Sequence, residues 1–349
     1  MLISASRTNY TVDFVENIEQ LLEALANNQN TLTIMDRNIE QLYPQLAENL
    51  KTFSKVECFD ATEQNKTLQG IESLLRVFQE NKANRATTVI AMGGGILQDV
   101  VSFAAHIYYR GLSVVLVPTT LLAMCDSSIG GKCGVNFQGY KNQVGAYHPP
   151  KQVVIWTGFL ASLSLLDLRS GYGEIFKYTL LSYATLYADL KLLFKQKSLI
   201  NESLIGFIRH GLMTKKKYIE EDEFDTSVRA LLNFGHTFGH ALELASQYKI
   251  PHGIAVAQGI DLANYIAWQK GLLKKELFDD VHLFVKQNFS CEIDGKVTAN
   301  MLIAHTQQDK KIVASKLKMV LMEDIGKFRM EAFVLDNELE MLVQNYLRL

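Results

Sequence analysis

The segment NFGHTFGH contains two histidines, His236 and His240, four residues apart. Residues at that spacing lie on one face of a helix, so both imidazoles can reach one centre. A catalytic zinc site uses three protein ligands, often imidazoles, and leaves a position open for substrate. His252, in the segment PHG, offers a third imidazole. The pattern indicates a metal site, and the open alternative is that these histidines are ordinary core or surface residues.

Glu174 lies in GYGEIFKY, on an otherwise apolar segment with helical spacing. A carboxylate buried on such a helix needs a partner or a metal ion. Carboxylates complete catalytic zinc sites built from His and Glu, so Glu174 is a candidate donor beside the histidines. The arrangement is not HExxH, which disfavours a zincin protease.

A glycine turn at 93–95 follows a predicted strand at 88–92 and precedes a predicted helix at 98–110. Backbone N–H groups and the helix dipole at such a turn can hold the pyrophosphate of a dinucleotide. The turn is not GxGxxG, and a plain tight turn is the alternative. Asp36 ends an earlier predicted strand, where it could bind a pair of ribose hydroxyls or act as a cap or turn residue.

Basic side chains gather in several motifs, among them Lys132 in DSSIGGKCGVN. A few of them brought together would suit a substrate that carries phosphate and carboxylate. A solvated surface role is the alternative for each, and KKK at 215–217 has the pattern of a charged helix face. The candidates are Arg110, Lys132, Lys141, Lys177, Lys215, Arg229, Lys310 and Lys311.

The composition of the 349 residues narrows the class of protein. With 35 Lys+Arg against 37 Asp+Glu, the chain lacks the basic excess that is usual for nucleic-acid binding. No apolar run approaches the roughly 20 residues that cross a bilayer, and the first residues do not resemble a secretion signal. The four cysteines form no CxxC motif, so neither a disulfide framework nor a thiolate zinc site is indicated. We expect a soluble, cytoplasmic, small-molecule enzyme that binds neither nucleic acid nor membrane.

The elements that must position these residues change in kind along the chain. Strand, glycine turn, helix and strand within about 30 residues form a βαβ unit, which implies a parallel sheet. After about residue 160 the pattern becomes helical, apart from a hairpin around Gly326. The sequence therefore predicts an α/β nucleotide-binding domain at 1–160 and a mainly helical metal- and substrate-binding domain at 161–349. The predicted strands are 31–35, 88–92, 113–117 and 152–156, the last of which could close the sheet.

Several separated motifs occur in one order: EQNKTL, GGGILQD, YYRG, VPTTLLA, DSSIGGK, GVN, KN, SGYGEIFKY, LLNFGHTFGHALE, PHG and DKK. In this combination the chain resembles the sugar-phosphate cyclase superfamily, and most closely the 3-dehydroquinate synthase family, from about Asp36 to Lys327. The resemblance implies a homodimer in which Arg110 reaches the substrate phosphate of the neighbouring subunit. It implies that Zn²⁺ or Co²⁺ is bound by Glu174, His236 and His252.

The resemblance also assigns the other site residues. Those around the substrate would be Lys177, Lys215, Arg229, Asn233, His240, Lys310, Asp126, Lys132 and Asn142. Those that contact NAD would be Asp36, Glu63, Lys66, Gly94, Gly95, Asp99, Thr119, Thr120, Lys132 and Lys141. The implied reaction, a step of the shikimate pathway to aromatic amino acids, converts 3-deoxy-D-arabino-heptulosonate 7-phosphate to 3-dehydroquinate and phosphate. It proceeds by transient oxidation, β-elimination, re-reduction and intramolecular aldol closure, so that NAD is regenerated and the net class is lyase.

Three departures from the family pattern keep other substrates open. Gln98 stands where a glycine is usual, Ile254 stands where a glutamate is usual beside His252, and NFQGYKNQVGAYHPP is similar to the sedoheptulose 7-phosphate cyclases. Those enzymes usually lack the counterparts of Arg229, Asn233 and His240, all of which are present here. Arg229, Lys132 and Asn233 suit the carboxylate of the heptulosonate. The alternatives are a 2-epi-5-epi-valiolone synthase-like or amino-dehydroquinate synthase-like cyclase, an NAD- and metal-dependent polyol dehydrogenase, or a non-catalytic sensor.

Overall fold

The computed structural model describes residues 1–138, 140–290, 297–306, 312–313 and 316–349. The chain divides into two compact units, Met1–Leu163 and Ser164–Leu349. The predicted division between residues 160 and 161 falls inside a short 3-10 helix, η4 (Thr157–Ser162). Among the described residues, no helix is both long enough and apolar enough to cross a membrane.

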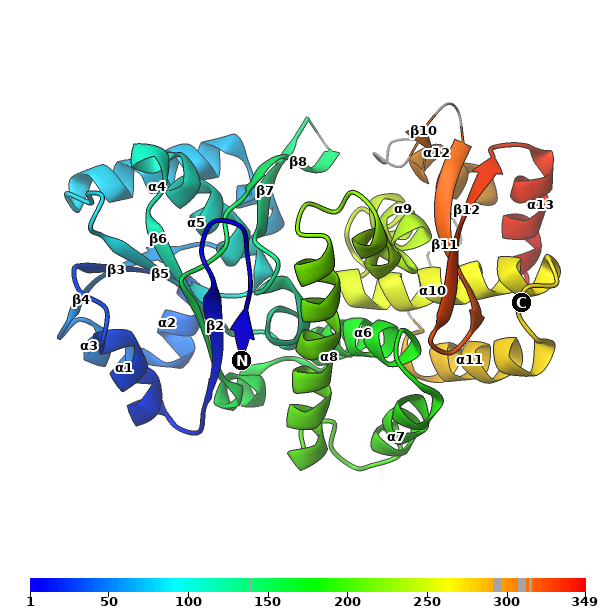
Figure 1. The fold of residues 1–349 in the computed structure, drawn as a ribbon, viewed down its shortest axis with the longest axis horizontal. Coiled ribbons are helices and arrows are strands. Elements are labelled where there is room, and N and C mark those ends of the chain that lie inside the picture. The colour runs from blue at the N-terminus through cyan, green and yellow to red at the C-terminus, as the bar shows by residue number, and fades with distance from the viewer. Residues whose placement is uncertain (139, 291–296, 307–311, 314–315) are drawn as a thin grey trace. The chain divides into compact units, whose positions relative to one another are not determined.

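The N-terminal unit contains a seven-stranded sheet, in the order β1-β2-β9-β6-β5-β3-β4 (Figure 1). Every pair in it is parallel except the short edge pair of β1 and β2. The predicted parallel α/β sheet is therefore confirmed. The strands are β1 (Leu2–Ile3), β2 (Tyr10–Val15), β3 (Thr31–Asp36), β4 (Ser54–Phe59), β5 (Thr88–Gly93), β6 (Ser113–Pro118) and β9 (Gln152–Trp156).

Strands β5 and β6 are almost wholly buried because a parallel sheet is covered on both faces, which explains their continuous apolar runs. The strand predicted at 152–156 is β9, but it does not close the sheet, since β2 pairs with its other side. Strand β2 was missed because Thr11 and Asp13 interrupt its apolar run, leaving a weaker, half-buried pattern. A separate hairpin of β7 (Lys132–Phe137) and β8 (Tyr140–Tyr147) was missed too.

The helix predicted at 98–110 is α5, but it begins at Gly95 and ends at Ile107. It ends there because the next residues leave the helical region: Tyr109, Arg110 and Gly111 have φ of +49°, +67° and +126°. The remaining helical elements of this unit are α1 (Ile18–Ala26), α2 (Arg37–Leu42), α3 (Pro44–Leu50), η1 (Glu63–Asn65), α4 (Leu68–Glu80), η2 (Tyr108–Arg110) and the π-helical turn η3 (Ala123–Ser127).

The C-terminal unit is mainly helical, as predicted. Helix α10 (His252–Gln269) is its centre: Gly253 to Ala267 are all buried, and α6, α9, α11 and α13 pack around it. The hairpin expected around Gly326 is also present, as β11 (Lys316–Asp324) and β12 (Lys327–Val334), with β10 (Ile312–Val313) beside β11. The other elements are α6 (Leu165–Leu180), α7 (Ala184–Phe194), α8 (Glu202–Glu221), η5 (Val228–Asn233), α9 (His236–Ala245), α11 (Lys275–Asn288), α12 (Ala299–Thr306) and α13 (Asn337–Tyr346).

Glycines in the SGYGEIFKY and PHG motifs let α6 and α10 approach closely. A Cβ added to Gly173 would lie 1.9 Å from the carbonyl oxygen of Gly253, and one added to Gly253 would lie 1.7 Å from that of Ser170. The Gly253 N–H donates to the Ser170 hydroxyl at 3.1 Å. These contacts are between backbones, so no side-chain rotation can make room for a methyl group.

We therefore expect G173A to lower the free energy of unfolding by about 3 kcal/mol or more, the upper range for overpacked cores. The matched control is G206A on helix α8, where nothing lies within 4 Å of the added Cβ. That variant should be neutral or more stable by about 0.5–1 kcal/mol, because alanine favours helix over glycine. Urea unfolding of both variants measures the difference, and equal stabilities would contradict the close-packing argument.

Candidate functional site

Three helices of the C-terminal unit bring a carboxylate and two imidazoles together. Glu174 lies in the middle of α6, His236 begins α9, and His252 begins α10. The Oε1 atom of Glu174 lies 3.5 Å from His236 Nε2 and 3.3 Å from His252 Nε2. Glu174 is fully buried, and within the described residues its Oε1 accepts no hydrogen bond. A buried carboxylate oxygen that faces two nitrogen atoms is suited to a cation.

The two distances from Glu174 Oε1 fit pairs of ligands on a tetrahedral ion. Zinc bonds of about 2.0–2.1 Å at tetrahedral angles separate two ligand atoms by about 3.3–3.4 Å, close to both observed distances. Three protein donors of this kind leave a fourth position for a substrate oxygen. The donor set that the sequence predicted is thus assembled in a geometry that a divalent ion can occupy.

Each of the three donors is also held on its far side. Lys177, one turn after Glu174 on α6, forms an ion pair with Glu174 Oε2. His236 Nδ1 lies 3.1 Å from the carbonyl oxygen of Phe234, and His252 Nδ1 lies 3.1 Å from Glu243 Oε2. Glu243 is the last residue of the LLNFGHTFGHALE motif, and no role was predicted for it. Its position seven residues after His236 places it on the same face of α9, which is the signal that could have identified it.

The electrostatics of His252 reflect this carboxylate environment. Burial opposes a charge on the ring, but Glu243 and Glu174 outweigh that effect and raise the pKa of His252 to about 10. A metal ion binds the neutral imidazole, so an ion at this site competes with a proton for His252.

His240 lies close to the same three side chains. Its ring centroid is 5.4 Å from that of His236 and 5.7 Å from that of His252. One nitrogen from each of the three rings lies within 4.8 Å of the other two. The site therefore offers four possible donors, and only the shorter Glu174 distances favour the set without His240.

The C-terminal unit also buries three of the predicted cations: Lys177, Lys215 and Arg229 are 2%, 9% and 3% exposed. The charged-face alternative for KKK fails for Lys215, which shares the buried face of α8 with Leu212 and Ile219. That spacing of three and four residues was present in the sequence. Lys177 pairs with Glu174, and the positive charge buried in this unit suits an acidic substrate.

Asp222 shapes the loop that carries Arg229 and Asn233. Its carboxylate accepts backbone N–H groups of Thr226, Ser227 and Arg229 at 2.7–3.1 Å. Burial opposes the carboxylate charge, but these hydrogen bonds outweigh it and lower the pKa of Asp222. The Arg229 guanidinium also donates to the carbonyl oxygen of Glu223. The loop is thus held from both ends before any substrate binds.

In the N-terminal unit, the glycine turn lies at the carboxyl end of β5, between β3 and β6. Gly94 caps α5 with no side-chain hydrogen bond, and a Cβ on Gly94 or Gly95 would lie 3.0 Å from Thr120 or 3.1 Å from Ser127. After β3 the chain forms β4 on one side of β3 and then β5 on the other side. This change of direction makes the edge between β3 and β5 the switch point at which α/β sheets bind ligands. Thr119 donates its N–H to Gly93. This cradle fits a pyrophosphate.

Asp36, at the end of β3, caps α2: its Oδ1 accepts the N–H of Asn38 at 3.0 Å. Helix capping, one of the two roles predicted for Asp36, is therefore observed. Burial raises the pKa of Asp36, although the hydrogen bonds from Asn38 oppose the rise. The second carboxylate oxygen is not needed for this cap, so capping does not prevent a ribose contact.

A polar cluster joins four of the other residues predicted to contact NAD. Lys66 Nζ lies 2.5 Å from Asp99, and Lys141 Nζ lies 3.7 Å from Glu63. Glu63 also accepts from the Asn136 amide at 2.7 Å, and Asn136 donates its backbone N–H to Lys66. Asn136, in the GVN motif, was not predicted; it ties the β7–β8 hairpin to these residues.

The remaining predicted residues are placed as follows. Arg110 is exposed in η2, Lys132 and Asn142 are exposed on the β7–β8 hairpin, and Asp126 is half-buried in η3. Lys310 and Lys311 lie outside the described residues. Gln98 is buried, with its amide nitrogen 3.4 Å from the Gly93 carbonyl oxygen. Ile254 is buried as well, and a carboxylate beside His252 comes instead from Glu243.

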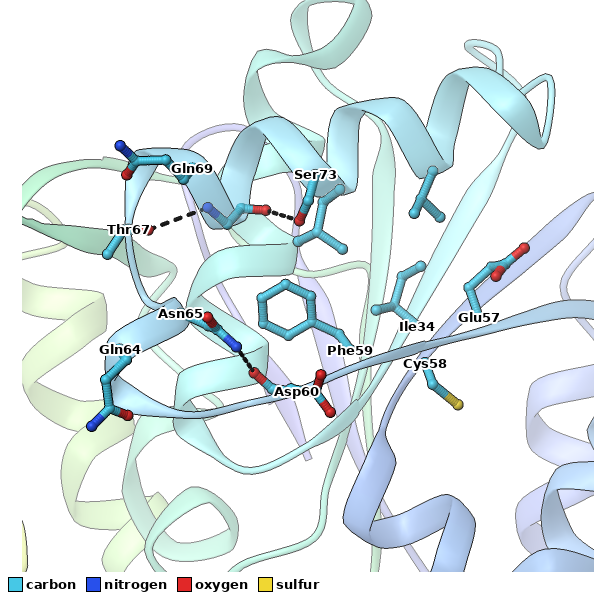
Figure 2. A pocket seen from close by; sticks show the side chains of 13 residues that line it. Ile34, Glu57, Cys58, Phe59, Asp60, Gln64, Asn65, Thr67, Gln69 and Ser73 are labelled. Carbon is cyan, nitrogen blue, oxygen red and sulfur yellow. Dashed lines mark hydrogen bonds between the residues drawn. The ribbon is translucent and has the colours of Figure 1, made fainter.

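A cavity of about 610 Å³ in the N-terminal unit lies between β4, η1 and α4 (Figure 2). Its lining includes Cys58, Phe59 and Asp60 on the strand side and Ser73 on the helix side. It contains none of the predicted site residues, although Glu63 and Lys66 are close in sequence to Gln64 and Asn65 on its rim. The cavity is therefore not the centre of the chemistry described above.

Comparison with protein families and curated proteins gives consistent matches. A family model described as 3-dehydroquinate synthase N-terminal matches residues 57–170, and one described as 3-dehydroquinate synthase C-terminal matches residues 171–312. The chain is 38% identical to 3-dehydroquinate synthase from Nostoc punctiforme over 269 residues, covering 76% of this chain and 74% of that protein. It is 36% identical to the Dictyoglomus thermophilum enzyme over 273 residues, covering 76% and 75%.

Solved structures of related cyclases share the fold. The chain superposes on 2-epi-5-epi-valiolone synthase from Streptomyces hygroscopicus, solved with NAD⁺ and Zn²⁺, with a TM-score of 0.87 and 28% identity, covering 99% and 98% of the two chains. It is similar to a 2-deoxy-scyllo-inosose synthase complexed with carbaglucose-6-phosphate, NAD⁺ and Co²⁺ (TM-score 0.86, 24% identity, 99% of each chain). Glycerol dehydrogenase from Schizosaccharomyces pombe shares the fold more distantly (TM-score 0.65, 13% identity, covering 98% of this chain and 91% of that one).

Proposed function

Because this chain belongs to the 3-dehydroquinate synthase family, we propose that it converts 3-deoxy-D-arabino-heptulosonate 7-phosphate to 3-dehydroquinate and phosphate. The observation that carries the proposal is the donor set of Glu174, His236 and His252 in a unit that also buries three cations. A neutral polyol needs no such cations, whereas a substrate with a phosphate and a carboxylate does.

We infer that the chain takes the two kinds of cofactor found in the related cyclase structures. The glycine cradle at the carboxyl end of β5 is suited to NAD, with Asp36 at the end of β3 and Thr119 and Thr120 directly after β6. The Glu174 donor set is suited to Zn²⁺ or Co²⁺, since both accept nitrogen and oxygen ligands. When bound, NAD supplies reversible hydride transfer at C5 of the substrate and the ion supplies Lewis acidity.

The chain's own residues then bind and orient the substrate. Lys177, Lys215 and Arg229 hold its anionic groups, and their burial strengthens the attraction because little water competes. Asn233 and His240 contact the substrate as well. Once C5 is a ketone, the neighbouring C–H is acidic, and the phosphate leaves by β-elimination with its own oxygen as proton acceptor. The cations stabilise the negative charge of the departing phosphate.

Three further features belong to the proposal. The net reaction is that of a carbon–oxygen lyase, because the nicotinamide ends in its starting state. The protein is a cytoplasmic homodimer, and Arg110, exposed after α5 in a turn of positive φ, contacts the substrate phosphate of the neighbouring subunit. Asp126, Lys132 and Asn142 are the other residues that we propose to contact the substrate.

Phosphate release by the purified chain tests the proposal. With NAD and Zn²⁺ or Co²⁺, we expect phosphate from the heptulosonate phosphate and no net NADH at steady state. Release from sedoheptulose 7-phosphate instead would assign the second candidate, which the similarity to 2-epi-5-epi-valiolone synthase favours. Net NADH formation with a polyol and no phosphate release would indicate a dehydrogenase and overturn both.

A further inference from the structure

The two histidines of the donor set are held differently behind their rings. His236 Nδ1 faces a backbone carbonyl, that of Phe234, whereas His252 Nδ1 faces the carboxylate of Glu243 at 3.1 Å. The Glu243 side chain is 3% exposed, so its charge acts in a medium with little water. Glu243 thus places a second negative charge behind the ring of His252, on the side opposite to Glu174.

A carboxylate in this place controls which nitrogen of the ring carries the proton. When Nδ1–H donates to Glu243, Nε2 keeps its lone pair, and Nε2 is the atom that faces Glu174 Oε1 at 3.3 Å. The same hydrogen bond fixes the orientation of the ring and increases the basicity of Nε2. A neutral acceptor would fix the ring but would add less basicity.

We propose that Glu243 is a positioning residue that acts through His252 and sets how tightly the site holds a divalent ion. The inference rests on the proposed function, since it takes Glu174, His236 and His252 as the ligands. The role of Glu243 is to orient and polarise His252, and it does not itself contact the ion or the substrate.

Another pair in the same unit supplies a matched control. Asp261 Oδ2 lies 2.7 Å from His282 Nδ1, and the Asp261 side chain is 2% exposed. Asp261 is on α10, nine residues after His252, which places it about 13 Å further along the helix axis. D261N therefore removes a buried carboxylate from a histidine without touching the donor set.

The experiment measures Co²⁺ affinity by chelator competition, and the visible Co²⁺ spectrum, for the purified full chain without NAD or substrate. We expect Co²⁺ to bind E243M about 100-fold more weakly and E243Q about 10-fold more weakly than the unsubstituted chain, the range seen for partners of metal-binding histidines. The ligand-field bands should shift in the same order. D261N should retain affinity within about twofold and an unchanged spectrum, even where it lowers thermal stability.

The outcomes separate the two proposals. If the unsubstituted chain binds Co²⁺ and E174Q or H252Q abolishes binding, but E243Q and E243M bind as tightly as the original, the role of Glu243 is overturned. If E174Q and H252Q leave binding intact, the proposed ligand set itself fails. Should E243M not fold, E243Q decides alone, because glutamine matches glutamate in size and its carbonyl oxygen still accepts a hydrogen bond from the Nδ1–H group.

Discussion

E174Q should lose its divalent ion, while H240Q should keep it. Glu174 Oε1 is within 3.5 Å of both His236 and His252, at the separation of two ligands on one tetrahedral ion. His240 has one nitrogen within 4.8 Å of nitrogens of His236 and His252, but the two short distances to the Glu174 carboxylate belong to His236 and His252. We therefore propose that His240 contacts the substrate.

Metal content after dialysis against a weak chelator measures this difference. For E174Q we expect a loss of affinity beyond about 100-fold, more than the change that follows from altering an outer partner of a ligand. H240Q should retain one ion per chain and show its defect in turnover. H236Q and H252Q should behave like E174Q. Loss of the ion from H240Q with retention in E174Q would require the three-histidine set instead.

K177M should destabilise the metal-free protein by about 3–5 kcal/mol, the cost of leaving one charge of a buried pair uncompensated. Lys177 is 2% exposed and Glu174 fully buried, and the two form an ion pair one turn apart on α6. The Lys177 ammonium also lies 4.6 Å from the centre of the Tyr178 ring. Without Lys177 the buried Glu174 carboxylate loses the cation paired with its Oε2 atom.

Urea unfolding with and without Zn²⁺ tests this account. Zinc should restore part of the lost stability of K177M, because a bound cation compensates Glu174, and stabilises the native state by mass action. The double variant E174Q/K177M should be more stable than K177M alone when metal is absent, since it removes the orphaned charge. The control is K216M on α8, a half-exposed pair with Glu220 at 3.5 Å, which should change stability by less than about 0.5 kcal/mol. Equal effects of K177M and K216M would contradict the argument.

Much of the fold could be read from the sequence because its signals are local. Apolar runs long enough for buried strands marked β3, β5, β6 and β9, and the glycines at 93–95 marked the strand-to-helix turn. Where a strand is half-buried, as in β2, or paired only with its hairpin neighbour, as in β7, polar residues break the pattern and the prediction failed. The start of α5 was missed because Gly94 caps it through its backbone, which leaves no capping side chain to recognise.

The types of donor and the helix face that carries them can be read from the residues alone: a carboxylate on α6, imidazoles at helical spacing on α9, and one more at the start of α10. Which of these side chains meet depends on how the helices pack. Glu174, His236 and His252 come from three helices, and their distances depend on how closely backbones pass at Gly173 and Gly253. The same is true of Glu243, whose carboxylate on α9 contacts His252 at the start of α10. The periodicity of a sequence shows on which face of its helix a residue lies. The residue that it contacts on a neighbouring helix is set by how the helices pack.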